Sequence, residues 1–192
     1  EEIERRLSWE YPYPNARKVK SKYSVSELSR EAACTAGHTR ESRDALFSSQ
    51  AEGANRGTVY HKVMERIPFP AGGMSETEIR AFLADLTRKE ILTKADAATV
   101  DPRRIAQFFG SPLGKSVCAA ENVWRELPFT LRKEREGESV LIQGTVDCCF
   151  LKNGKYILLD YKTNAVRNDT ESLSEIAEIY RPQLALYREA LE

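Results

Sequence analysis

The sequence lacks the features that would identify a membrane protein, a secreted protein or a strongly basic nucleic-acid-binding protein. No apolar run approaches the ~20 residues that span a bilayer, and the opening residues Glu1-Glu2-Ile3-Glu4-Arg5-Arg6 contain no apolar signal core. We therefore expect a cytoplasmic domain without a membrane partner. An excess of positive charge is also missing, because 29 basic residues balance 29 acidic ones. Binding to nucleic acid would thus depend on local basic stretches.

Two such stretches exist. They are Arg17-Lys18-Val19-Lys20-Ser21-Lys22, and Arg125 followed by Arg132-Lys133-Glu134-Arg135. Each is either a solvated face or a track for phosphates, and charge alone does not decide between the two.

Cysteines are few and lack the spacing of a metal cluster. Cys34, Cys118, Cys148 and Cys149 form no Cys-x-x-Cys pair, and neighbouring residues of a strand point to opposite faces. The pattern argues against zinc, an iron–sulfur cluster and a disulfide framework. It predicts buried structural thiols. The chain does have 41% hydrophobic and 30% charged residues over 192 positions, which suits one domain with a real core.

The apolar pattern predicts helices on both sides of a group of strands. Capping boxes, apolar periodicity and Pro68 predict helices over residues 24–34, from about Thr58 to Ile67, in two or three segments within 75–108, and from 172 to the end. Residues 35–56 are polar and predict a loop. Strands are predicted over Val123–Leu131, Val140–Leu151 and Tyr156–Lys162.

The most informative turn is Asn153-Gly154, the strongest two-residue signal for a type I′ hairpin. With these two residues as the loop, Lys152 pairs with Lys155 and Asp147 lies opposite Asp160. Opposed residues share a face with Cβ atoms roughly 5 Å apart. Lys162, two residues beyond Asp160, points the same way.

Two carboxylates within apolar strands repel each other and are poorly solvated unless a cation lies between them. A hard divalent ion such as Mg²⁺ satisfies both. The alternative is an ion pair on a solvated face, with Lys162 neutralising one acid. The register and the apolar run that leads into Asp160 favour a site.

Two helical pairs with a spacing of four residues are further candidates. His61 and Glu65 face the same way on one helix, as do Gln183 and Tyr187 on the last one. Taken singly, each is more typical of structural or solvated positions. Gly110-Ser111-Pro112-Leu113-Gly114-Lys115-Ser116 resembles a P-loop, but it has one residue too few between the glycines and follows a helical segment, so we expect no ATP site here.

Four motifs occur in a fixed order. They are Gly57-Thr58-x-x-His61-x-x-x-Glu65, Gly144-Thr145-x-Asp147, Asp160-Tyr161-Lys162-Thr163 and Gln183-x-x-x-Tyr187. In this order they resemble the RecB-type nuclease domain of the PD-(D/E)XK superfamily over most of the chain. Trp9-Glu10-Tyr11-Pro12-Tyr13 and Arg125-Glu126-Leu127-Pro128-Phe129 are also similar to the C-terminal nuclease domain of AddA-type subunits of bacterial helicase–nucleases.

The resemblance implies that His61, Asp147 and Asp160 bind the metal, which is Mg²⁺ with Mn²⁺ as a substitute, and that Lys162 is catalytic. Gln183 and Tyr187 match a helix motif that positions DNA or the active-site lysine, while Glu126 has no assigned role. The AddB-type partner subunit carries a cysteine-ligated iron–sulfur cluster. The cysteines of this chain are arranged differently, so no cluster is expected.

The implied fold is α/β, a restriction-endonuclease-like core with a mixed central sheet flanked by helices and extra N-terminal helices. We expect residues 1–192 to be one nuclease domain excised from a larger chain. Within it, 1–56 would be an extension and 57–192 the catalytic core. The strand that usually follows the Gln–Tyr helix is not seen before Glu192.

The implied activity is metal-dependent exonucleolytic hydrolysis of single-stranded DNA during double-strand-break repair and recombination, with the 3′-terminated strand as target. Expected partners are DNA, a helicase motor in the same full-length chain and an AddB-type subunit, in the bacterial cytoplasm. The alternatives are a catalytically silent module that guides a DNA strand and a free-standing exonuclease of the Cas4 type.

Overall fold

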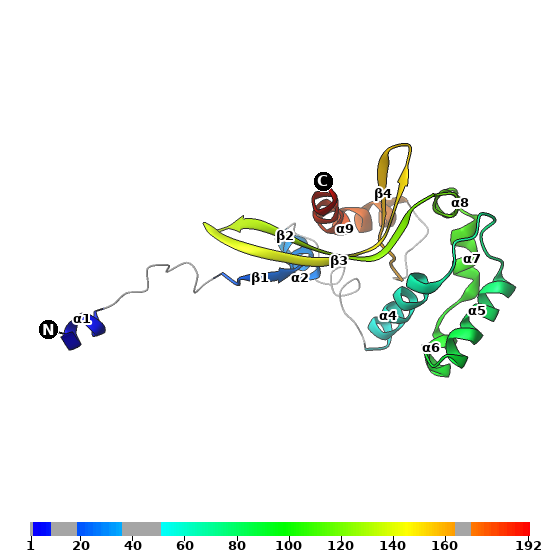
Figure 1. The fold of residues 1–192 in the computed structure, drawn as a ribbon, viewed down its shortest axis with the longest axis horizontal. Coiled ribbons are helices and arrows are strands. Elements are labelled where there is room, and N and C mark those ends of the chain that lie inside the picture. The colour runs from blue at the N-terminus through cyan, green and yellow to red at the C-terminus, as the bar shows by residue number, and fades with distance from the viewer. Residues whose placement is uncertain (1, 9–18, 36–50, 164–169) are drawn as a thin grey trace.

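A mixed four-stranded sheet organises the residues that this computed structural model describes, which are 2–8, 19–35, 51–163 and 170–192. Strand β3 is its centre. β2 pairs antiparallel along one edge of β3, and the other edge carries β1 in parallel and β4 antiparallel (Figure 1). The predicted α/β class, with a mixed sheet flanked by helices, is confirmed. In chain order the elements are α1 (Glu2–Leu7), β1 (Lys22–Ser24), α2 (Val25–Thr35), α4 (Ala51–Arg66), α5 (Glu76–Arg88), α6 (Lys94–Thr99), α7 (Pro102–Gly110), α8 (Pro112–Cys118), β2 (Val123–Arg135), β3 (Glu138–Lys152), β4 (Lys155–Leu159) and α9 (Thr170–Leu191).

Two tight turns set the register of the three long strands. Glu136 and Gly137 join β2 to β3, and Asn153 and Gly154 join β3 to β4, and all four residues have positive φ. A type I′ turn requires this at both central positions, and its twist matches that of the flanking strands. The predicted Asn-Gly hairpin is therefore confirmed.

The β3–β4 pairing keeps the predicted register as far as Cys148 and Leu159. β4 ends there, three residues before its predicted end. The backbone N–H of Tyr161 donates to the carboxylate of Asp147 at 2.7 Å instead of to a backbone carbonyl of β3. A side chain thus ends the ladder at the point where the predicted site begins.

Helices cover the sheet in two groups, each with its own hydrophobic cluster. The first cluster joins β3 and β4 to α4, α5, α7 and α8, and the second joins the strands to α2 and α9 (Figure 1). Cys148 belongs to the first cluster and its neighbour Cys149 to the second, and both are fully buried. Both faces of the sheet are therefore covered at this end. The predicted burial of the thiols is confirmed for Cys118, Cys148 and Cys149, but it is wrong for Cys34 on α2, which is exposed.

Helix α4 begins at Ala51, earlier than the predicted start near Thr58. The expected loop over residues 35–56 is therefore wrong for its last six positions and also for Thr35, which ends α2; positions 36–50 lie outside the described residues. It ends at Arg66, before Pro68, as predicted. The guanidinium of Arg125 on β2 caps the C-terminal end of α4, because its Nη1 donates to the carbonyls of Glu65 (3.0 Å) and Ile67 (2.5 Å).

Strand β1 and helix α2 connect the N-terminal part of the chain to the sheet. Ser24 and Glu27 form the predicted capping box at the start of α2, with hydrogen bonds of 3.2 and 3.4 Å, and β1 pairs with β3 directly before it. The division predicted at residue 56 falls inside α4. Helix α9 begins at Thr170, slightly before the capping box predicted at Ser172, and runs through Pro182 without ending.

Gly144 on β3 allows a close approach between α2 and the sheet. A Cβ at this position would lie 2.6 Å from Cγ2 of Val25 and 2.7 Å from Cζ of Phe129, closer than real side-chain contacts.

Among the described helices, none is both long and apolar enough to cross a bilayer.

Candidate functional site

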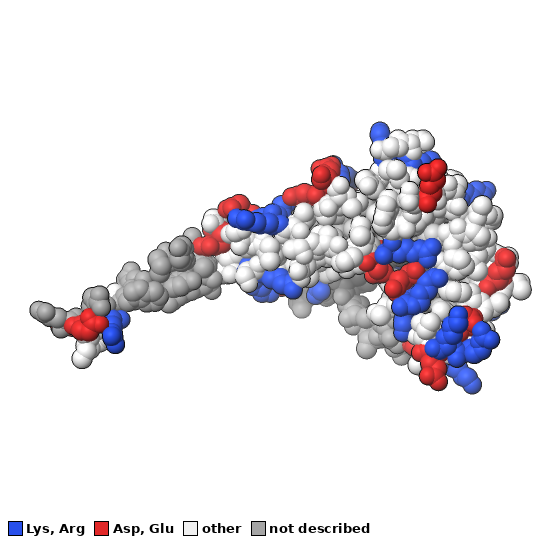
Figure 2. Space-filling view, viewed as in Figure 1, with Lys and Arg blue, Asp and Glu red and all other residues white. Residues whose placement is uncertain are grey.

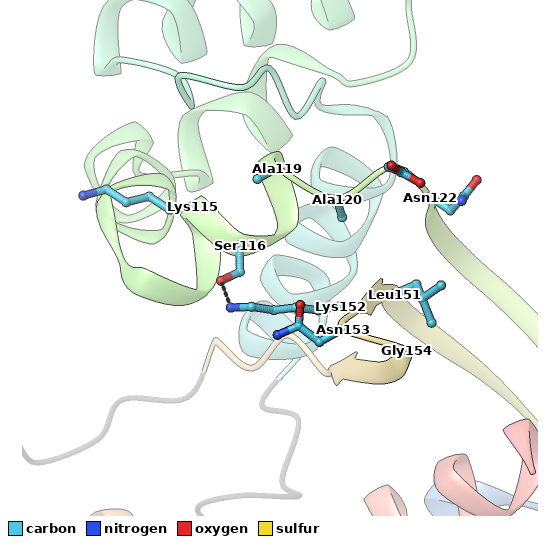
Figure 3. Close-up of a pocket in the computed structure, with 10 residues that line it drawn as sticks. Lys115, Ser116, Ala119, Ala120, Asn122, Leu151, Lys152, Asn153 and Gly154 are labelled. Carbon is cyan, nitrogen blue, oxygen red and sulfur yellow. Dashed lines mark hydrogen bonds between the residues drawn. The ribbon is translucent and has the colours of Figure 1, made fainter.

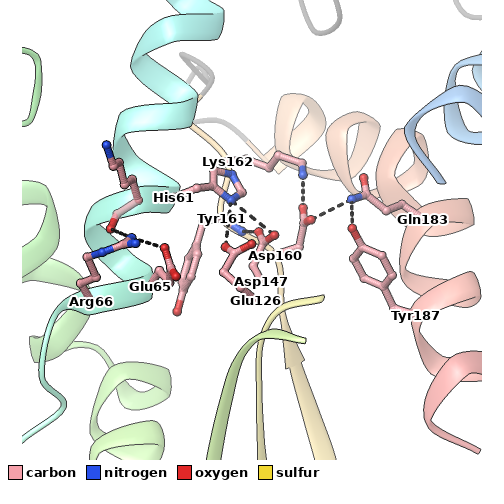
Figure 4. Close-up of polar contacts among 11 residues, drawn as sticks. His61, Glu65, Arg66, Glu126, Asp147, Asp160, Tyr161, Lys162, Gln183 and Tyr187 are labelled. Carbon is pink, nitrogen blue, oxygen red and sulfur yellow. Dashed lines mark hydrogen bonds and ion pairs between the residues drawn. The ribbon is translucent and has the colours of Figure 1, made fainter. Parts of the chain in front are cut away.

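Three acid or imidazole side chains meet at the centre of the sheet. His61 comes from α4, Glu126 from β2 and Asp147 from β3, and one donor atom of each lies within 4.8 Å of the other two (Figure 4). Nδ1 of His61 lies 3.4 Å from Oδ1 of Asp147 and 3.9 Å from Oε1 of Glu126. Asp147 is buried, whereas the other two side chains are about one third exposed. Solvent therefore reaches the group through His61 and Glu126, whereas Asp147 is enclosed.

Glu126 owes its position to an unusual backbone conformation. It has φ of +46° within β2, in the left-handed region that residues with a Cβ rarely adopt. The regular pairing of β2 with β3 omits Glu126, which stands between the pairs Arg125–Cys148 and Leu127–Val146, opposite Asp147. This local break in the ladder turns the glutamate beside Asp147, and strain of this kind is typical of functional sites.

A second polar group lies beside the first. The side chain of Asp160, one residue beyond the last β3–β4 pair, forms an ion pair with Lys162 and accepts a hydrogen bond of 2.9 Å from Nε2 of Gln183. Nε2 of Gln183 also lies 2.6 Å from the hydroxyl of Tyr187. Both residues are buried on α9. Figure 4 shows the carboxylates of Asp147 and Asp160 facing the same space between α4 and α9.

The acids are held in surroundings that disfavour their charge. Burial raises the pKa of Asp160 despite the neighbouring Lys162, and the charge of Asp147 raises it further. Burial and the same Asp147 charge raise the pKa of Glu126. The hydrogen bond to Asp147 raises the pKa of His61, against the opposing effect of burial. Clustered carboxylates with raised pKa values are relieved by a cation placed among them.

The donor set and its dimensions fit a divalent ion. Two atoms that each bind one Mg²⁺ at 2.0–2.1 Å lie about 3 Å apart when adjacent and about 4 Å apart when opposite. The distances from His61 to Asp147 and Glu126, 3.4 and 3.9 Å, lie between these two values, so small movements of the side chains would bring the donors around one ion. One imidazole and two carboxylates are donors for a divalent cation, and the group has no thiolate of the kind that soft metals prefer.

The predicted ligands are only partly gathered into one group. His61 and Asp147 meet, whereas Asp160 is engaged by Lys162 and Gln183, and it is absent from the donor group found among the described residues. Glu126 completes that group instead. Its place was open to prediction, because counting back from a two-residue Glu136-Gly137 turn puts Glu126 opposite Asp147, just as the second hairpin puts Asp160 there. Glu65 pairs with Arg66 and stays outside the group.

The second basic stretch proves to be paired within the chain. Arg125 bonds to the end of α4, Arg132 donates to Ser139, Lys133 pairs with Glu189 and Arg135 with Glu31. In the first stretch, Lys20 pairs with Glu27, and residues 17 and 18 lie outside the described part of the chain. Figure 2 shows basic and acidic side chains interspersed over one face, without a field of a single sign.

The P-loop-like segment comprises the last residue of α7, the cap Ser111 and the first five residues of α8, so it lacks the strand and loop of a nucleotide site. Two of its residues, Lys115 and Ser116, line a cavity of about 570 Å³ between α8 and the β3–β4 turn (Figure 3). Lys152 donates to Ser116 there, at 2.7 Å. Six residue steps along β4 separate Gly154 in the turn from Asp160, roughly 20 Å at about 3.3 Å each, so this cavity is remote from the site.

Known proteins resemble this chain over its whole length. The chain is 36% identical over 200 residues to the A subunit of the ATP-dependent helicase/nuclease from Anoxybacillus flavithermus, and 34% and 33% identical over 218 and 216 residues to the proteins of the same name from Geobacillus kaustophilus and Acetivibrio thermocellus. Each match covers 100% of this chain but only 16–18% of the relative, so the chain spans about a sixth of their length. The predicted resemblance to such subunits is confirmed. Residues 22–192 also match the family model of the PD-(D/E)XK nuclease superfamily; the chain belongs to this superfamily.

Proposed function

We propose that the chain is a divalent-metal-dependent deoxyribonuclease domain that hydrolyses phosphodiester bonds of single-stranded DNA. The observation that carries the proposal is the meeting of His61, Glu126 and Asp147 from three separate elements within 4.8 Å. A solvated surface would not gather two acids around an imidazole, since their charges repel and one of them is buried.

The residues proposed to hold the metal are His61, Asp147 and Asp160, together with Glu126. Mg²⁺ is the expected ion, with Mn²⁺ as a substitute. A divalent ion bound there would polarise the phosphate and lower the pKa of a bound water. Cys34, Cys118, Cys148 and Cys149 are all free, and we assign them no cluster.

Lys162 is proposed as the group that stabilises charge on the pentavalent phosphate. Its ammonium is held by the carboxylate of Asp160 and lies 4.7 Å from the centre of the Tyr180 ring. Gln183 fixes the other oxygen of Asp160, and Tyr187 in turn lies against Gln183. This series of contacts from α9 to Lys162 therefore restricts the position of the ammonium before DNA binds. The ammonium then needs less reorganisation in the transition state.

We further propose that a helicase motor in the full-length chain feeds the strand to this domain, with a partner of the AddB type, during double-strand-break repair and recombination. The relatives are named as helicase/nuclease subunits, which supports the proposal of a helicase motor in the full-length chain. The 3′-terminated strand is the proposed target. Because the chain carries no net charge, DNA binding by the chain alone should be weak and fall steeply with salt.

The test compares the chain with Asp147→Asn, Lys162→Ala and the matched exposed control Lys155→Ala. End-labelled single-stranded oligonucleotide is incubated with Mg²⁺, and Mn²⁺ binding is followed by calorimetry. Asp147→Asn should lose both metal binding and cleavage, whereas Lys162→Ala should bind Mn²⁺ and cleave at least roughly a hundredfold more slowly, in line with the loss of one transition-state donor. Lys155→Ala should behave as the parent chain.

Cleavage by Asp147→Asn at the parent rate, in a preparation free of other nucleases, would contradict the proposed metal site. DNA binding by the parent chain without any cleavage, in Mg²⁺ or in Mn²⁺, would instead favour the silent strand-guiding module.

A further inference from the structure

A cavity of about 290 Å³ opens directly beside the proposed catalytic residues. It lies between α4, α7 and α8, and the segment that follows β4, including Asp160 and Lys162, forms one wall. Tyr60 and Met64 of α4 and Leu159 of β4 line it and are buried. No step of the proposed hydrolysis uses this space.

The walls are aromatic and apolar. Phe108 of α7 and Tyr161 both line the cavity, and their rings meet edge to face at 90°, with centroids 6.1 Å apart. The ring of Tyr161 also approaches His61 edge-on at 6.3 Å. The cavity and the proposed metal site thus lie on either side of the short segment that contains Tyr161. Leu113 of α8 also lines the cavity and is 42% exposed.

The cavity also contains cationic groups. Lys162 is engaged with Asp160. The guanidinium of Arg104, another lining residue, forms no direct ion pair or hydrogen bond among the described residues, although, after the hydrogen bonds from Arg103, its charge helps to lower the pKa of Asp101. Its neighbour Arg103 lies outside the lining and pairs with Asp101 at 3.3 Å. A free guanidinium is available for a phosphate, to which it can present two donors.

Aromatic walls beside an unpaired cation match one chemical class, a flat ring joined to a phosphate. Bases have π-faces that stack on aromatic side chains whatever their identity, while basic groups follow the backbone. The volume is near the lower end of ligand cavities, which suits one base and not a longer segment.

We propose that this cavity receives one nucleobase of the substrate strand next to the scissile phosphate, and that Arg104 contacts an adjoining phosphate. The inference rests on the proposed nuclease function and assigns a subsite to it. Holding the neighbouring base fixes the strand relative to Asp160 and Lys162 without reading its sequence.

The test uses end-labelled oligothymidylates that each contain one abasic site, moved one position at a time. The parent chain should cut roughly tenfold more slowly, the contribution of one stacked base, at one bond that keeps a constant offset from the abasic site. In Leu113→Trp, the indole fills the cavity from an exposed position, so general cleavage should slow and the offset effect should disappear.

Arg104→Ala should raise KM for the intact strand roughly tenfold, as for one lost bidentate contact, with kcat little changed. Arg103→Ala, its matched control, should keep the parent KM. Mn²⁺ binding measured on each variant shows that the metal site remains folded.

The base subsite is overturned if the parent chain shows no fixed offset between the abasic site and the slowed bond. It is also overturned if that offset persists in Leu113→Trp. An effect of Arg104→Ala without any abasic effect also overturns it, since it would show a backbone contact only. If the parent chain cleaves nothing, the proposed nuclease function fails first. Cleavage that ignores abasic sites leaves that function standing and removes only the subsite.

Discussion

Replacing Arg125 with methionine should weaken the fold and the proposed metal site together. The guanidinium donates to two carbonyls at the end of α4, those of Glu65 and Ile67, and lies 4.0 Å from the centre of the Phe69 ring. Methionine keeps the length of the side chain but loses the charge and the donors. Arg125 adjoins Glu126 in β2, while α4 carries His61, so this contact joins two of the elements that meet at the site.

The magnitude follows from these contacts. Hydrogen bonds from a charged donor contribute about 1.5–3 kcal/mol, and a cation over a ring about 0.5–1 kcal/mol when partly exposed. The terms overlap, so we expect Arg125→Met to lower the free energy of unfolding by about 2–4 kcal/mol. For a chain of this size, this lowers Tm by roughly 5–15 °C. A shift of α4 should also weaken Mn²⁺ binding.

Urea unfolding followed by circular dichroism measures the first effect and calorimetry with Mn²⁺ the second. Arg132→Met is the matched control, because that arginine lies on the same strand and only bonds to the exposed Ser139 at 2.8 Å; it should cost below about 1 kcal/mol. Arg125→Lys, which keeps the charge, should lie between the two. Equal stability of Arg125→Met and Arg132→Met would refute the contribution assigned to the contact. Lost stability with unchanged Mn²⁺ affinity would refute the link to His61.

Two further outcomes are expected. Gly144→Ala should lower the free energy of unfolding by about 1–3 kcal/mol, as overpacking does, because its Cβ would meet Val25 and Phe129; an unchanged urea midpoint would show that α2 can move away at no cost. Cys34 is the exposed thiol among the four, and burial raises the pKa of Cys148 to about 11, so a thiol reagent at neutral pH should react quickly with one group in the native chain and with four after unfolding. Two fast groups would contradict the described burial.

The turns and strands were predictable because their signals are local. Asn153-Gly154 fixes the twist that joins two strands, and the alternation of apolar residues then sets which side chains are opposed. The start of α4 was not predictable in this way. Residues 51–56 carry little apolar periodicity, and tertiary contacts of the helix, such as that of Arg56 with the carbonyl of Thr163 at 3.1 Å, are invisible in a local window.

The candidate site was predictable in its members but not in their pairing. Register placed Asp147 and Asp160 together, yet Gln183 arrives from a helix far along the chain and engages Asp160 with Lys162. Contacts of this separation leave no local pattern. The backbone of Glu126 is the other surprise, because glutamate has no preference for positive φ and only the observed geometry reveals it.

The positive φ of Glu126 places stability and the proposed metal binding in conflict at a single residue. A left-handed residue with a Cβ costs about 1–2 kcal/mol, and glycine at the same position would be free of this cost. A library of this chain selected only for survival of heating would therefore enrich Glu126→Gly and discard a carboxylate of the proposed metal site. Selection for cleavage would drive the same position back. Sequencing both selected pools would therefore show Glu126→Gly enriched after heating and depleted after selection for cleavage. The enrichment after heating reports the stability cost of the strained glutamate.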